Sequence, residues 1–168
     1  MVRLRTVVLP LAFAAALVAQ QPARPKDVRE AAKAGSSAIP RLTQYLKDPS
    51  VDVRAEAVKQ IIEIGPPRSL DPLLLATRDA DAQIQILATD GLVNFYLPGY
   101  FKSGVGASLR RVGTGIKGRF TDTNDQVIDR YISVRPEVVT ALAAVLNNGA
   151  TRDAKANAAR ALGVLRAS

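Results

Sequence analysis

The chain has 168 residues, 23 basic and 15 acidic side chains and a formal charge of +8, which fits a single domain. It has no cysteine and no histidine, which excludes disulfide scaffolds, thiol chemistry, His-based catalytic triads and the usual zinc sites. Apolar residues make up 48% of the chain, while 11 glycines and 10 prolines are too few for a collagen-like or disordered protein. We therefore expect one folded domain without a metal or cofactor.

The first 19 residues have the pattern of a secretory signal peptide. Arg3 and Arg5 precede an uninterrupted apolar run at residues 6–19, and Ala19 supplies the small residue that cleavage requires. This run is shorter than the roughly 20 residues that a membrane-spanning helix needs. We expect cleavage after Ala19 and an exported, periplasmic or secreted protein with no transmembrane span in the mature chain. An uncleaved N-terminal anchor is the alternative.

Downstream of the signal, apolar residues follow helical spacing in paired blocks. One stripe covers residues 39–46 and a second covers 53–64. Residues 48–50 (Asp-Pro-Ser) supply a turn between the stripes, and Gly65 with the two prolines after it ends the second helix. This pattern predicts two helices joined by a short turn.

The same unit recurs twice along the chain. A shift of about 31 residues places Val53 and Ile61 onto Ile84 and Leu92, and a further copy lies at 137–166. Because a lone hairpin cannot bury its apolar face, such units stack on one another. The repeats predict an all-α fold, an α-solenoid of about three to four hairpins in a single domain at 20–168.

The turn and second helix of the first unit, DPSVDVRAEAVKQIIEIG, resemble a HEAT repeat of the short bacterial kind. In that family an acidic residue in the turn is followed by Val-Arg, then by small and apolar positions that end in glycine. The matching residues are Asp48, Val53, Arg54, Ala57 and Gly65. The resemblance spans about 26–98 and 137–166. It implies a scaffold that binds proteins without catalysis.

The resemblance also implies a structural role for the acidic and basic residues of the turn. Asp48 and Arg54 are expected to form a capping or ladder pair within the array. Gln85 and Lys155 stand where Arg54 stands in the first copy, so we do not expect an Asp–Arg ladder through the whole array. The last helix is apolar and no polar helix follows it, which predicts an end face closed by a partner, a second copy or further repeats.

Residues 99–136 interrupt the repeat pattern, as an irregular insertion or a degenerate repeat with an enlarged loop. Residues 102–119 carry five basic side chains and no acidic one, flanked by most of the aromatic residues of the mature chain. Loops on one face of a solenoid often carry binding, and arginine with aromatic residues is typical of interfaces. The candidate binding surface comprises Tyr100, Phe101, Lys102, Arg110, Arg111, Lys117, Arg119 and Phe120. Residues 127–132 have the spacing of a helical stripe.

Three interpretations of this loop stay open: a solvated loop with aromatics that fill irregular packing, a surface for an unidentified protein, and a binder of an anionic envelope surface or polymer. Nucleic acid is not expected, because the signal sends the chain away from it. The glycines at 113, 115 and 118 lack the preceding strand of a dinucleotide site. No acid/base or nucleophile constellation is evident, and we expect no enzymatic activity.

Overall fold

The computed structural model describes residues 22–100 and 127–166. This part of the chain forms seven α-helices and a 3-10 turn at Gly35–Ala38, with no strand in the described residues. The helices are α1 (Pro25–Ala32), α2 (Ile39–Tyr45), α3 (Val51–Ile64), α4 (Leu70–Ala76), α5 (Ala82–Tyr96), α7 (Pro136–Asn148) and α8 (Arg152–Val164). The predicted signal peptide lies outside the described residues.

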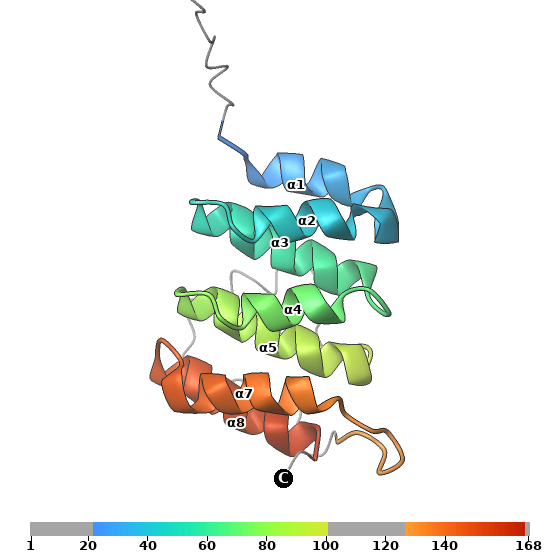
Figure 1. The fold of residues 1–168 in the computed structure, drawn as a ribbon, viewed down its shortest axis with the longest axis vertical. Helices are drawn as coiled ribbons and strands as arrows, with labels where there is room; N and C mark the ends of the chain where they lie inside the picture. The colour runs from blue at the N-terminus through green and yellow to red at the C-terminus, as the bar shows by residue number, and fades with distance from the viewer. Residues whose placement is uncertain (1–21, 101–126, 167–168) are drawn as a thin grey trace, which may run out of the picture.

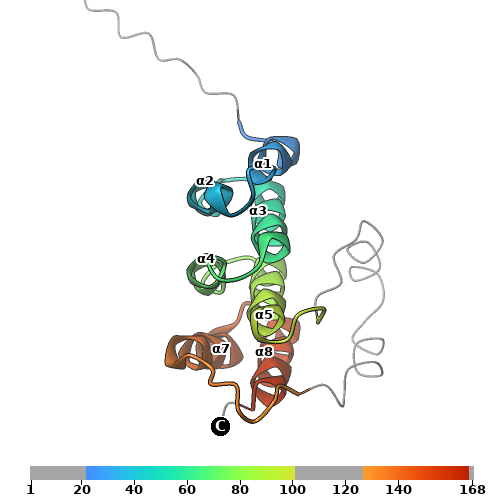
Figure 2. The same cartoon turned by 90° about the vertical axis from the view of Figure 1, so that its right-hand side faces the viewer.

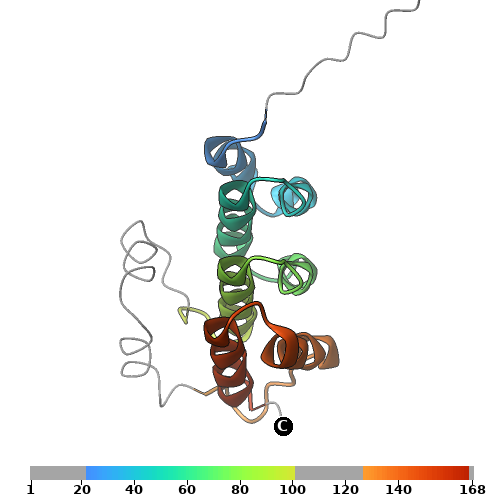
Figure 3. The same cartoon turned by 90° about the vertical axis from the view of Figure 1, so that its left-hand side faces the viewer.

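The helices form a stack two layers thick. Figure 1 shows the hairpins α2–α3, α4–α5 and α7–α8 following one another along the long axis, with α1 at the start. Figure 2 and Figure 3 show the two layers edge on: α1, α3, α5 and α8 form the α3 layer, and α2, α4 and α7 form the α4 layer. The predicted all-α solenoid of helical hairpins is confirmed.

Local signals in the sequence set the helix ends. Gly65 adopts a left-handed φ of 72° at the C-terminus of α3, a conformation that glycine reaches without strain. At the start of α5 the Asp81 carboxylate accepts hydrogen bonds from the backbone N–H groups of Gln83 and Ile84. Thr151 caps α8 in the same way, accepting from the N–H of Ala154.

The core lies between the two layers and follows the predicted stripes. Its fully buried members recur at equivalent places of the three hairpins: Val53, Ala57 and Ile61, then Ile84, Ala88 and Leu92, then Ala154 and Ala158. A Cβ atom at Gly91 would lie 2.7 Å from Ile62 Cγ1 and 2.9 Å from Leu73 Cδ2. Glycine therefore lets α5 approach both α3 and α4 closely.

The third hairpin follows the second directly in the stack, because α8 packs along α5 with no described helix between them. Residues 127–135, just before α7, are turn and irregular chain, so the predicted helical stripe at 127–132 is wrong. Ile128 is 2% exposed and its N–H donates to the Val164 carbonyl at 3.0 Å, whereas Tyr131 is 85% exposed.

This segment changes the expectation for the end of the array. Val164 and Leu165, at the end of α8, are buried within the same core cluster as Ile128. The predicted uncovered apolar end is therefore closed in part by the chain itself. None of the described helices has the length and hydropathy of a membrane-spanning segment.

Candidate binding groove

A groove of about 520 Å³ opens between α4 and α7 in the α4 layer. Leu74, Thr77 and Arg78 line it from the α4 side, and Glu137, Thr140, Ala141, Ala144, Val145 and Asn148 line it from α7. Volumes of about 300–1,000 Å³ are typical of pockets that bind ligands. Apolar and polar side chains both line the groove, a mixture that suits recognition of a chain segment.

The groove exists because the two layers pack differently. In the α3 layer α5 and α8 lie against each other along their length, while α4 and α7 meet only locally. The α4 helix has 7 residues and α7 has 13, so much of α7 has no neighbour in its own layer. The α7 positions that line the groove at its middle are Ala141 and Ala144, whose side chains are too small to fill the space.

The two ends of the groove differ in charge. Arg78 is exposed at the end of α4, and its guanidinium makes no ion pair within the described part of the chain. At the start of α7, Arg135 lies 3.3 Å from Glu137 Oε2 and 3.6 Å from Asp71 Oδ1. The backbone N–H of Glu137 and then the Arg135 guanidinium hold the pKa of the Glu137 carboxyl below its ordinary value. One end therefore carries Arg78, and the other carries Glu137, with Arg135 and Asp71 next to it outside the lining.

Beneath the groove, Gln85 of α5 joins the second and third hairpins. Its side-chain Nε2 donates to the Asp79 carbonyl at 2.8 Å, and its Oε1 accepts from the Ala150 N–H at 2.9 Å. Gln85 is buried, so both bonds lie away from bulk water. This contact sets the spacing of the turns that end α4 and α7.

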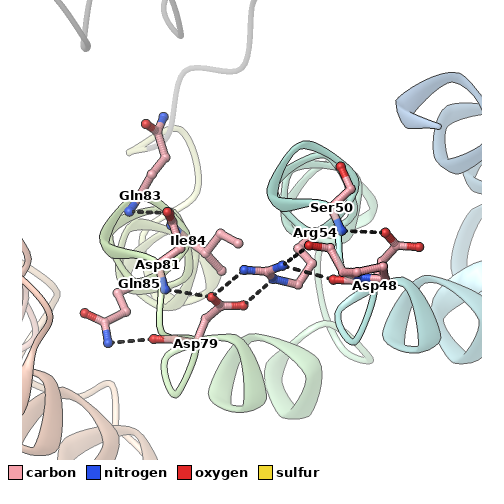
Figure 4. Close-up of polar contacts among 9 residues, drawn as sticks. Asp48, Ser50, Arg54, Asp79, Asp81, Gln83, Ile84 and Gln85 are labelled. Atoms are coloured by element: carbon pink, nitrogen blue, oxygen red, sulfur yellow. Dashed lines mark hydrogen bonds and ion pairs between the residues drawn. The ribbon is translucent and has the colours of Figure 1, made fainter. Parts of the chain in front are cut away.

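The first and second hairpins are joined by Arg54, at the equivalent place one repeat earlier. Figure 4 shows its guanidinium between the two turns: Nε and Nη2 donate to the Asp79 carboxylate at 2.8 and 3.1 Å, and Nη1 donates to the Asp48 carbonyl at 3.0 Å. The Asp79 hydrogen bond raises the pKa of Arg54. The Asp48 carboxylate instead accepts from the Ser50 N–H.

Arg54, Gln85 and Lys155 stand at the same position of the three repeats and make different contacts there. Arg54 and Gln85 each bind the carbonyl six residues back and a group on the next turn, Gln85 as a neutral amide. Lys155 donates to the Asn147 carbonyl at 2.9 Å, within its own hairpin. At this repeat position, an ion pair between arginine and aspartate occurs once in the described residues. The equivalent contact of Gln85 with the next turn is a hydrogen bond without charge.

A further polar cluster holds α5 to α8. Asn157 Nδ2 donates to Asp90 Oδ1 at 2.9 Å, and both side chains are buried. The Arg160 guanidinium lies 3.9 Å from the same Asp90 oxygen and 5.4 Å from the centroid of the Tyr100 ring. Tyr100 is therefore attached to the α3 layer, next to α8.

Of the sequence-predicted binding surface, the structure describes Tyr100 alone. The remaining members, Phe101, Lys102, Arg110, Arg111, Lys117, Arg119 and Phe120, lie outside the described residues. Figure 2 shows the chain after α5 leading away from the α4 layer, so Tyr100 and the groove belong to different layers. Phe95 and Tyr96 pack against the core with their ring centroids 5.1 Å apart, and Tyr96 Oη accepts from the Arg135 N–H.

Sequence reasoning missed the groove residues Arg78, Glu137, Ala141 and Ala144. Two features of the sequence point to them: small residues at helical spacing on one side of 136–148, and an arginine directly after the second copy's first stripe. Among the described residues no group of three His, Cys, Asp or Glu side chains could hold a metal ion.

Comparison with known proteins agrees with this architecture. A family of HEAT repeats matches residues 14–93, which covers α1 and the hairpins α2–α3 and α4–α5 up to the last turn of α5. No curated protein matches the chain. Over this part of the chain, the stack of helical hairpins is therefore similar to HEAT repeats.

Proposed function

We propose that this chain is a non-catalytic protein-binding module, and that the α4–α7 groove receives part of the partner. The observation that carries the proposal is the open groove with a mixed apolar and polar lining and with Arg78 and Glu137 at opposite ends. HEAT repeats generally mediate protein–protein interaction, and stacked repeats present extended surfaces for it.

The test fills the groove and leaves the fold intact. Ala144→Trp places an indole in the groove, and Ala156→Trp places one on an exposed site of α8 outside it. Each variant and the parent chain capture proteins from the cell that makes them, and captured proteins are quantified by mass spectrometry. We expect a defined partner whose recovery falls at least tenfold with Ala144→Trp and stays unchanged with Ala156→Trp. Equal recovery of every captured protein by both variants would refute the groove as the interface.

The basic segment supports a second function, binding of an anionic envelope surface or polymer. Residues 102–119 carry five basic side chains and no acidic one. Contacts of this kind weaken as salt screens the charges. Sedimentation with vesicles that contain anionic lipid should fall steeply between low and moderate salt and should require 102–119. Binding that ignores salt would remove this candidate.

We also propose that the protein is exported. The motivating feature is the apolar run at 6–19 after two arginines. Intact-mass analysis of the protein from its own cell should find a mature chain that starts at Gln20, outside the cytoplasm. A full-length chain in the cytoplasm would contradict export.

A further inference from the structure

We infer that the α4–α7 groove binds an extended peptide segment of a partner protein, with an acidic side chain of that segment at Arg78. This inference rests on the proposed function and adds the conformation, charge and direction of the occupant.

The length of the groove suits a short extended chain. Its α7 wall runs from Glu137 to Asn148, which at about 1.5 Å per residue is about 16 Å long. An extended chain rises about 3.3 Å per residue, so about five residues span the same wall. An extended segment of about five residues therefore reaches from one end of the groove to the other.

The lining can satisfy an extended backbone. Ala141 and Ala144 leave room for a main chain to approach α7 closely. Thr140 and Asn148 line the groove, and their side chains make no hydrogen bond within the described part of the chain. Both side chains can donate and accept, and a buried peptide needs partners for its N–H and C=O groups.

Charge sets the direction of the segment. Arg78 is a cation without a described partner at one end, whereas Asp71 and Glu137 outnumber Arg135 at the other. A segment with an acidic residue near the Asn148 end and a basic residue near the Glu137 end places each of its charges beside a group of opposite sign. The reversed segment would place like charges together at both ends, which costs affinity.

The test uses the mature chain, residues 20–168, and a phage-displayed library of random nonapeptides. Enriched peptides are synthesised with a fluorophore and their affinity is measured by fluorescence polarisation. We expect an acidic residue at one fixed position, at least tenfold weaker binding by Arg78→Glu, and recovery of binding when that acidic residue is changed to lysine. Arg68 is also exposed and lies outside the groove, so Arg68→Glu should change affinity less than twofold.

Other results separate this inference from the proposed function. A second outcome is that the enriched peptides show no acidic preference and that their affinity falls with Ala144→Trp but not with Arg78→Glu. This outcome would overturn the inference and keep the groove as an interface. Peptides that bind only as helices, by circular dichroism, would do the same. Peptides unaffected by Ala144→Trp would overturn both.

Two outcomes would assign the groove to another occupant. Tenfold tighter peptide binding by a chain that lacks 102–119 would mean that this segment fills the groove. A dimer in light scattering that Ala144→Trp dissociates would mean that a second copy fills it. The dimer would overturn the inference of a partner's peptide, whereas the competing segment would support it, because the peptide then binds the same groove.

Discussion

Replacing Arg54 by methionine tests whether the Arg54–Asp79 contact holds the first two hairpins together. The side chains of both residues are mostly buried, 15% and 11% exposed. The substitution keeps most of the aliphatic stem and removes two hydrogen bonds to the Asp79 carboxylate, one to the Asp48 carbonyl and one to the Pro49 carbonyl. Asp79 then retains the Asp81 N–H as a donor but has lost its cation.

The expected cost follows from burial and geometry. Removing one partner of a buried ion pair costs about 3–5 kcal/mol, and exposed pairs contribute about 0–1 kcal/mol. Since this pair is bidentate and mostly covered, we expect Arg54→Met to lower the free energy of unfolding by about 2–4 kcal/mol. Arg29 and Glu56 form the matched control, because they lie 3.3 Å apart with the arginine 55% exposed. Arg29→Met should cost less than about 1 kcal/mol.

Urea unfolding followed by circular dichroism measures these free energies, and a double-mutant cycle with Asp79→Asn isolates the pair. A coupling energy of about 1–3 kcal/mol is expected for residues that share hydrogen bonds. Hydrogen exchange should accelerate in α3 and α4 and stay unchanged in α8, since each repeat contacts only its neighbours. Equal costs for Arg54→Met and Arg29→Met, or a coupling energy near zero, would refute the reasoning.

The remaining stability predictions concern contacts between the hairpins. Gly91→Ala should lower the free energy of unfolding by about 1–3 kcal/mol, because the added methyl overlaps its neighbours. At Gly163 a Cβ meets open space, so Gly163→Ala should instead stabilise the helix by up to about 1 kcal/mol; thermal unfolding compares the two. Gln85→Met removes two inter-turn hydrogen bonds, and Asn157→Ala removes a donor from buried Asp90. Each should cost about 1–3 kcal/mol in urea unfolding, and a cost below about 0.5 kcal/mol would show that water replaces the bonds.

The stripe of apolar residues was sufficient to predict the repeats. Val53, Ala57 and Ile61 recur at fixed spacing because the same face of each helix is buried in every hairpin. The same reasoning predicted a helical stripe at 127–132, and this prediction is wrong. Ile128 is buried by docking against Val164, a long-range contact that no local period encodes, and Tyr131 faces solvent.

The periodicity of the sequence did not predict the groove, because the groove also depends on contacts between residues far apart in the chain. It depends on how far α4 lies from α7, two helices whose groove residues Leu74 and Ala141 are far apart in sequence. That distance is set by contacts in the other layer and by the turns. A sequence shows small residues such as Ala144, but it does not show that no neighbour fills the space beside them.

The contacts between hairpins connect stability with binding, because they fix the spacing of helices that otherwise touch little. Asn157 lies in the α3 layer and does not line the groove, yet its bond to Asp90 holds α8, and with it α7, against α5. Asn157→Ala should therefore weaken peptide binding as well as stability. Arg54→Met acts one interface away, between α3 and the turn after α4, and should lower stability while affinity stays within twofold. If both variants lowered peptide affinity in proportion to their loss of stability, the groove would depend on folding alone. The contact between the second and third hairpins would then have no separate effect on binding.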